Sequence, residues 1–186
     1  MTARFAVILD ANVLFPASLR DTLLRAARAG LYDAMWSGQI LDEVSRNLIS
    51  TNRMTVEQVD HLRAQMQRFF PQATVSGYEA LIPVLTNDEK DRHVLAAAIH
   101  GHAPVIVTVN TKHFPRVSLH PYGVEAQRPD DFLTRLYHAD PDLVAFIIRQ
   151  QAAALKRPAH TPEQVLDTLA RHAPRFVALV RPSVAP

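Results

Sequence analysis

Apolar and polar residues follow two periods along this chain, and the two periods predict strands and helices in turn. Short apolar runs predict buried strands, of which Phe5–Leu9 and Pro104–Thr108 are the clearest. Between them, apolar residues of the segment Gln39–Ser50 recur at 40, 41, 44 and 48, the spacing of one helix face. Because strands and helices alternate, the pattern predicts an α/β fold with a mostly parallel, covered sheet.

The other elements continue this alternation up to residue 139. Shorter strands are expected at 33–37, 73–75 and 124–126, and helices at 18–30, 55–70, 87–101 and 129–137. Ser18 is the expected cap of the first of these helices. From residue 140 only helical patterns remain, at 141–156 and from Thr161 onward. We therefore expect two domains, an α/β domain of residues 1–139 and a C-terminal helical extension of residues 140–186.

Composition narrows the class of protein. The 186 residues are 48% hydrophobic and 20% charged, as in ordinary globular proteins, which argues against disorder. There is no cysteine, so disulfides and thiolate metal sites are impossible. No run approaches the roughly 18 apolar residues of a membrane span. With a net charge of only +2, these features predict a soluble, cytoplasmic protein without membrane attachment.

Polar residues follow the predicted strands at positions where ligand crevices open. Asp10 ends the first strand, and Asn110 follows the strand at 104–108. Carboxyl ends of strands line the ligand crevice of open α/β sheets. Glu43 lies at the rim of the apolar face of its helix, and Asp91 lies in the first turn of another helix. The four side chains can therefore share one crevice.

This set of residues favours a hard divalent cation. Carboxylate and amide oxygens without cysteine or histidine partners suit Mg²⁺ or Mn²⁺. Such a site can activate water and neutralise the charge that develops during displacement at a phosphodiester. A simpler interpretation stays open for the helix starts, because Asp88 and Asp91 can each be helix caps or dipole partners.

Three segments together resemble a known family. Phe5–Leu14 resembles the opening of a PIN domain, while Lys90–Ala98 and Ile106–Pro115 resemble its later motifs. Arg128–Leu133 fits the closing helix of that family. The resemblance covers roughly residues 4–137 and implies a three-layer αβα fold. It also implies a metal-dependent endoribonuclease, most often the toxin of a VapC-type, type II toxin–antitoxin pair.

The resemblance also assigns roles by position. It implies that Asp10, Glu43 and Asp91 bind the metal, and that Asn12 and Thr108 support them by hydrogen bonds. Many members have a fourth acidic residue where this chain has Asn110, which we include in the catalytic set. The family implies Mg²⁺ or Mn²⁺, an RNA substrate, a cognate antitoxin and a homodimer. Attack by water should leave 5′-phosphate and 3′-hydroxyl ends.

Basic residues and histidines complete the expectations. Lys112 is the preferred phosphate contact, and Arg20 is a second candidate for RNA binding, with a solvated helix face as its alternative. The histidines lack the spacing of zinc ligands. For His93 and His113 a structural role is the preferred interpretation, and a hydrogen-bonding role beside the site is the alternative for His93.

Three other functions were weighed. Asp10-Ala11-Asn12 is similar to the Asp-x-Asp motif of haloacid-dehalogenase-like phosphatases, but Asn12 cannot serve as their general acid. A response-regulator receiver would need an acceptor Asp after a middle strand, and Ala73-Thr74-Val75-Ser76 supplies none. A catalytically degenerate PIN-like RNA-binding or scaffold protein is the more serious alternative, and metal binding in the crevice distinguishes it.

Overall fold

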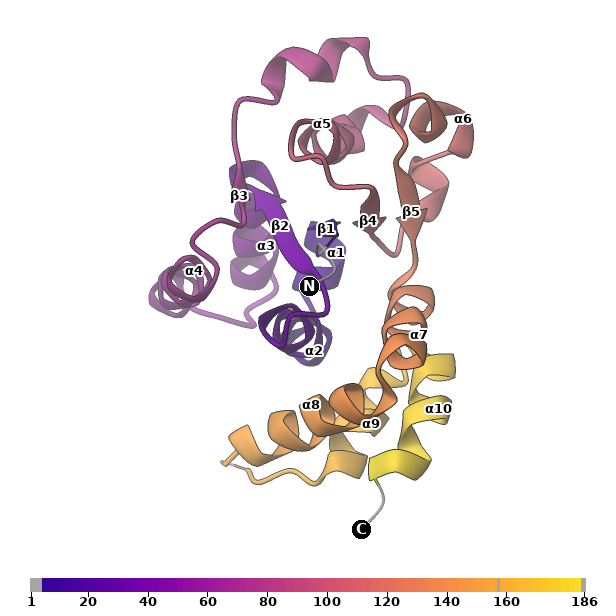
Figure 1. Cartoon of the computed structure of the whole chain (residues 1–186). Helices are drawn as coiled ribbons and strands as arrows, with labels where there is room; N and C mark the ends of the chain where they lie inside the picture. The colour runs from indigo at the N-terminus through magenta and orange to yellow at the C-terminus, as the bar shows by residue number, and fades with distance from the viewer. Residues whose placement is uncertain (1–4, 157, 185–186) are drawn as a thin grey trace. The chain divides into compact units, whose positions relative to one another are not determined.

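The computed structural model describes residues 5–156 and 158–184, which form two compact units (Figure 1). The first unit contains the chain up to Phe15 together with Tyr32–Gln127. The second contains Pro16–Leu31 and the chain from Arg128 onward. The boundary expected at residue 140 remains a prediction about domains. The compact units separate earlier, after Gln127, and the second includes a helix from near the start of the chain.

A five-stranded sheet forms the centre of the first unit. Its strand order is β3-β2-β1-β4-β5, and every neighbouring pair is parallel. The strands are β1 (Ala6–Leu9), β2 (Asp33–Ser37), β3 (Thr74–Val75), β4 (Val105–Val107) and β5 (Glu125–Gln127). Val7–Leu9 of β1 and all three residues of β4 are at most 3% exposed, as their unbroken apolar runs predict. The predicted α/β fold with a parallel sheet is confirmed.

Helices cover both sides of this sheet (Figure 1). The α-helices of this unit are α1 (Ala11–Leu14), α3 (Gly38–Ser50), α4 (Val56–Phe69), α5 (Arg92–His100) and α6 (Arg116–Leu119). Short 3₁₀ turns connect them: η1 (Glu79–Val84), η2 (Glu89–Asp91), η3 (Thr111–His113) and η4 (His120–Tyr122). The buried residues of α3 are Ile40, Leu41, Val44 and Leu48, the face predicted from the sequence.

Local sequence sets the ends of α3 and α4. Ser37 accepts a hydrogen bond from the Ile40 N–H and caps α3. At the other end Asn52 takes a left-handed conformation with φ 54°, and the Arg53 N–H donates to the Leu48 carbonyl. This is a Schellman ending, which satisfies carbonyls left unpaired by the helix. Thr55 and Gln58 then form a capping box that starts α4.

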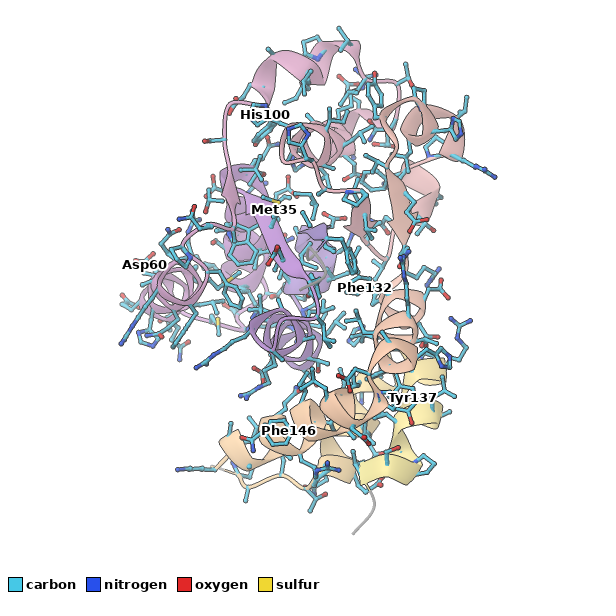
Figure 2. The ribbon with its side chains drawn as sticks, in the orientation of Figure 1. Met35, Asp60, His100, Phe132, Tyr137 and Phe146 are labelled. Atoms are coloured by element: carbon cyan, nitrogen blue, oxygen red, sulfur yellow. The ribbon has the colours of Figure 1, made fainter. Side chains whose placement is uncertain are left out.

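Five helices make up the second unit. They are α2 (Ala17–Arg28), α7 (Pro129–Ala139), α8 (Pro141–Ala154), α9 (Pro162–Leu169) and α10 (Pro174–Val184). Phe132 and Phe176 are fully buried in this unit. Tyr137 and Phe146 (Figure 2) lie nearer its surface, and the Tyr137 hydroxyl pairs with Ser183 at 3.0 Å. The predicted C-terminal helices are therefore confirmed as elements.

Polar contacts explain why α2 belongs to the second unit. The Thr22 hydroxyl donates to Gln151 Oε1 at 2.7 Å, and Gln151 Nε2 donates to the Ser18 carbonyl at 3.0 Å. Gln151 is 1% exposed, so these bonds satisfy an amide that would otherwise be buried at a cost. They tie α2 to α8 across 129 and 133 residues of sequence.

Two details differ from the sequence predictions. Ser18 does not cap α2; Pro16 occupies the N-cap position without a side-chain hydrogen bond, because the helix begins one residue before Ser18. The short helix α1, directly after Asp10, is absent from the helices predicted from the sequence. Within residues 5–156 and 158–184, no helix combines the length and apolar character that a membrane span requires.

Candidate active site

Asp10 lies where the order of the strands reverses. From β1 the chain moves outward to β2 and β3, and it returns to the other side of β1 with β4 and β5. Leu9 pairs with Val107 in register, so Asp10 and Thr108 leave the sheet side by side. Such a switch point opens a crevice at the carboxyl ends of parallel strands. The topology therefore places Asp10 at the position most suited to hold a ligand.

The Asp10 carboxylate is held by three donors. One oxygen accepts the Ala11 N–H at 2.7 Å, and the other accepts Asn12 Nδ2 and the Thr108 hydroxyl, both at 2.6 Å. The Thr108 oxygen also accepts Asn12 Nδ2 and the Asn110 N–H, each at 3.0 Å. Thr108 thus uses its one proton and both lone pairs. The network fixes the carboxylate, which is 3% exposed.

Neighbouring charges and burial both act on Asp10. Burial raises the pKa of Asp10 above its ordinary value of 3.8, and the negative charges of Asp91 and Glu43 raise it further. The hydrogen bonds from Thr108 and Ala11 lower the pKa and oppose these effects. The structure therefore brings Asp91 and Glu43 close enough to Asp10 for their negative charges to act on it.

A histidine contacts Glu43. Glu43 projects from α3, and its Oε1 lies 3.0 Å from Nε2 of His93 in the first turn of α5. The His93 side chain is 3% exposed, whereas Glu43 is 27% exposed. The contact joins α3, which carries Glu43, to α5, which follows Asp91 directly.

A second histidine contacts Asp91, the residue that precedes α5. His113 Nδ1 lies 2.6 Å from Asp91 Oδ2, and the Asp88 N–H donates to the His113 carbonyl at 3.1 Å. In the described part of the chain, Asp88, Asp91 and His113 form the one group of three whose potential ligand atoms lie within 4.8 Å of one another. Asp88 also caps η2 through the Lys90 N–H, as its capping interpretation predicts.

Comparison with known proteins agrees with this geometry. A family model described as a PIN domain matches residues 6–112, more than half of the chain. The chain belongs to the PIN domain family. A second family model, the VapC50 C-terminal domain, matches residues 129–182, nearly all of the helical segment from α7 to α10.

A curated relative carries the same family name. The chain is 43% identical over 105 residues to a Mycobacterium tuberculosis protein named "Putative ribonuclease VapC50". The match covers 56% of this chain and 62% of the relative, so the chain spans about three fifths of that protein's length. No solved structure matches the chain significantly.

The other predicted site residues, Asn110, Lys112 and Arg20, differ in solvent exposure. Asn110 follows β4 and is half-buried, with its backbone N–H on Thr108. Lys112 is exposed in η3, two residues further on. Arg20 belongs to α2 in the second unit and is only 7% exposed, and burial lowers the pKa of its guanidinium. Its proposed contact with RNA stays a prediction, and its burial does not favour it.

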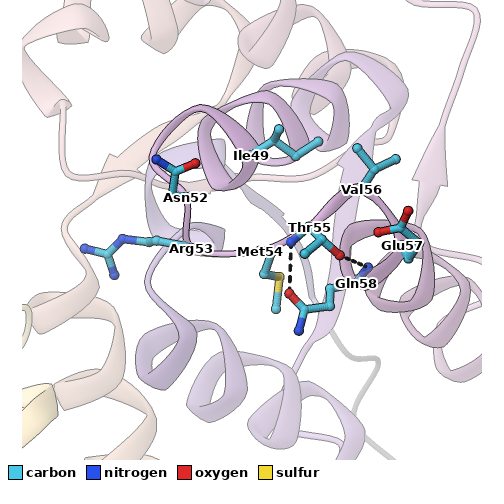
Figure 3. Close-up of a pocket in the computed structure, with 8 residues that line it drawn as sticks. All are labelled: Ile49, Asn52, Arg53, Met54, Thr55, Val56, Glu57 and Gln58. Atoms are coloured by element: carbon cyan, nitrogen blue, oxygen red, sulfur yellow. Dashed lines mark hydrogen bonds between the residues drawn. The ribbon is translucent and has the colours of Figure 1, made fainter.

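The structure places both histidines beside predicted metal ligands, His93 against Glu43 and His113 against Asp91. The sequence favoured a structural role for each and gave a hydrogen-bonding role beside the site as the alternative for His93, so only the contact of His113 was not anticipated. The signal lies in position, since each follows an acidic or amide site residue by two or three places. A pocket at the α3–α4 connection, lined by Ile49 and Asn52–Gln58, includes none of the predicted site residues (Figure 3).

The raised pKa of Asp10 predicts how stability depends on pH in metal-free protein. The fold favours the protonated carboxyl, so the stabilising contribution is complete below 3.8 and is lost as pH rises through the raised pKa. Asp91→Asn removes one repelling charge and should lower the Asp10 pKa and reduce that loss. NMR titration of the Asp10 carboxyl carbon and melting curves between pH 4 and 7 measure both effects.

Asp60→Asn provides the control for this titration. Asp60 is exposed on α4 (Figure 2) and is not among the charges that shift the Asp10 pKa. The variant should leave the Asp10 titration unchanged. An Asp10 pKa that is the same in Asp91→Asn and in the wild type would contradict the proposed repulsion.

Proposed function

We propose that this protein is a metal-dependent endoribonuclease that hydrolyses RNA phosphodiester bonds, and that it is the toxin of a type II toxin–antitoxin pair. The observation that carries the proposal is the buried Asp10 carboxylate at the switch point, with its pKa raised by burial and by the charges of Asp91 and Glu43. Membership of the PIN domain family supports it, as does the similarity to a protein named as a ribonuclease.

The residues present fit a divalent cation. Negative charges that repel a buried carboxylate are compensated by a cation, and oxygen donors suit Mg²⁺ or Mn²⁺. We assign Asp10, Glu43 and Asp91 as the metal ligands, with Asn110 beside them. Asp88 and His113 lie next to Asp91 and add a carboxylate and an imidazole to its surroundings. When bound, such a cation lowers the pKa of water and neutralises charge on the scissile phosphate.

The protein's own groups orient the reactants. Asn12 and Thr108 fix the Asp10 carboxylate through hydrogen bonds, so its orientation costs little when substrate binds. Glu43, more exposed than Asp10, is placed to accept a hydrogen bond from the attacking water. Lys112 is exposed close to Asn110 and offers an ammonium group for a phosphate of the RNA. The water attacks phosphorus, and the 3′-oxygen leaves.

Partners and location follow from the same proposal. A toxin of this class works on cytoplasmic RNA and is kept inactive by a cognate antitoxin. A cationic antitoxin side chain would pair with the repelling carboxylates of Asp10, Glu43 and Asp91. We also propose a homodimer. The proposed cytoplasmic location agrees with the absence of a membrane-spanning helix among the described residues.

Cleavage of end-labelled total RNA tests the proposal. We expect discrete cuts with Mn²⁺ or Mg²⁺, none with EDTA, and products with 5′-phosphate and 3′-hydroxyl ends. Products with 2′,3′-cyclic phosphate would exclude attack by water. An absence of both cleavage and metal binding would favour a degenerate PIN-like RNA-binding or scaffold protein.

A further inference from the structure

The position of His93 is unusual for a polar residue. It lies at the start of α5 and is 3% exposed, and the next five residues, Val94–Ala98, are apolar and fully buried. Among the described residues, neither ring nitrogen has a hydrogen bond of good geometry. Glu43 Oε1 lies beside the ring, 3.0 Å from Nε2. Burying an imidazole in this way costs free energy that an apolar side chain would avoid.

The arrangement of His93 bears on the orientation of the Glu43 side chain. Its side chain has three rotatable bonds and is 27% exposed, so it can turn toward water. Repulsion from Asp10 favours that outward turn when no cation is present. His93, in α5, is fixed by its packing in the core, and its Nε2 contacts the Glu43 carboxylate.

The carboxylates of Asp10 and Asp91 are each oriented by neighbouring side chains. Asp10 accepts Asn12 and Thr108, and Asp91 is paired with His113. Glu43 is the third of these carboxylates, and His93 is the side chain in contact with it. We propose that His93 is a positioning residue that keeps the Glu43 carboxylate beside the other two. This inference rests on the proposed function and deepens it. Residues that contact metal ligands in this way orient them. Mutation of such a residue typically lowers metal affinity 10- to 100-fold.

Three replacements of His93 separate positioning from packing. His93→Gln carries an amide nitrogen that reaches about as far as Nε2, whereas the amide of His93→Asn ends near the Nδ1 position. His93→Leu is apolar and fills the core. We expect Mn²⁺ affinity, measured by electron paramagnetic resonance titration, to fall roughly 10-fold in the Leu and Asn variants. The Gln variant should stay within about threefold of the wild type.

Cleavage kinetics supply the second readout. The Leu and Asn variants should show lower kcat at saturating RNA with little change in KM for RNA, because Glu43 acts on the reacting groups. His120→Gln, an exposed histidine of η4, is the control and should match the wild type in both measurements. Melting temperatures identify any variant that is unfolded. The difference between His93→Gln and His93→Asn in Mn²⁺ affinity and kcat then decides between positioning and packing, since both replacements are polar.

A double-mutant cycle with Glu43→Gln completes the test. If His93 acts through Glu43, His93→Leu should change Mn²⁺ affinity less than about twofold in the Glu43→Gln background. The inference is overturned if His93→Leu leaves Mn²⁺ affinity unchanged, or weakens it equally in both backgrounds. If the wild type binds Mn²⁺ but cleaves no RNA, the proposed function fails, and the Mn²⁺ affinities still judge the role of His93.

Discussion

Asp91→Asn is expected to reduce the rate of RNA cleavage by roughly 10²–10³-fold. The replacement keeps the shape of the side chain and removes one of the three charges that face the crevice. It also weakens the pairing with His113, whose Nδ1 lies 2.6 Å from the carboxylate. Asparagine is well tolerated at helix N-caps, so α5 should still begin at Arg92. Single-turnover cleavage at saturating Mn²⁺ measures the loss.

Asp42→Asn is the matched control for this experiment. Asp42 lies next to Glu43 on α3, is exposed, and pairs with Arg63 at 2.6 Å on the surface. Exposed pairs of this kind contribute little to stability, so the variant should cleave as the wild type does. Cleavage by Asp91→Asn at the wild-type rate would remove Asp91 from the active site, and equal losses in both variants would indicate a general effect of charge.

Much of the fold could be predicted because it depends on local patterns. The apolar face of α3 and the runs at β1 and β4 encode which residues are buried, whatever the rest of the chain does. The start of α4 at Thr55 was likewise predictable from a polar cap before the helix. The cap of α2 was not, because Pro16 fixes the helix start through its backbone without a side-chain bond.

The nearness of the predicted carboxylates to one another follows from the sequence more directly than the partners of the two histidines. Asp10 follows a strand, and the end of a parallel strand has a known place in the fold. The contact of His113 with Asp91 spans 22 residues of sequence, and that of His93 with Glu43 depends on how α5 packs on the sheet. No spacing rule encodes such contacts, because they arise only after the helices and loops have packed.

In the second unit, too, the sequence predicted the helices but not which of them pack together. The sequence predicted a helical extension from residue 140, and the helices there are present. It could not predict that α2 packs on α8 and α9, since that contact joins segments more than a hundred residues apart. The hydrogen bond between the buried side chains of Thr22 and Gln151 is one of the contacts that join these segments.

Removal of residues 128–186 is therefore expected to prevent the remaining chain from folding as a soluble monomer. The truncation removes α8 and α9, on which α2 packs, and leaves Thr22 without its buried partner Gln151. Fully exposing a leucine costs about 1.5–3 kcal/mol, and α2 carries Leu19 and Leu23, both fully buried. Exposing both would cost about 3–6 kcal/mol, a large share of the total stability of many domains, about 5–15 kcal/mol. Size-exclusion chromatography and thermal melting of the shortened chain measure the effect.

Supplying the missing helices separately provides the control. If the loss comes from the unpaired α2, then residues 128–186 added as a second polypeptide should restore a soluble complex with a cooperative melt. Gln151→Leu in that polypeptide should weaken the restored complex, because the Thr22 hydroxyl and the Ser18 carbonyl lose their hydrogen bonds to Gln151. A chain of residues 1–127 that is monomeric alone and melts at the temperature of the full protein would show that α2 does not depend on the C-terminal helices.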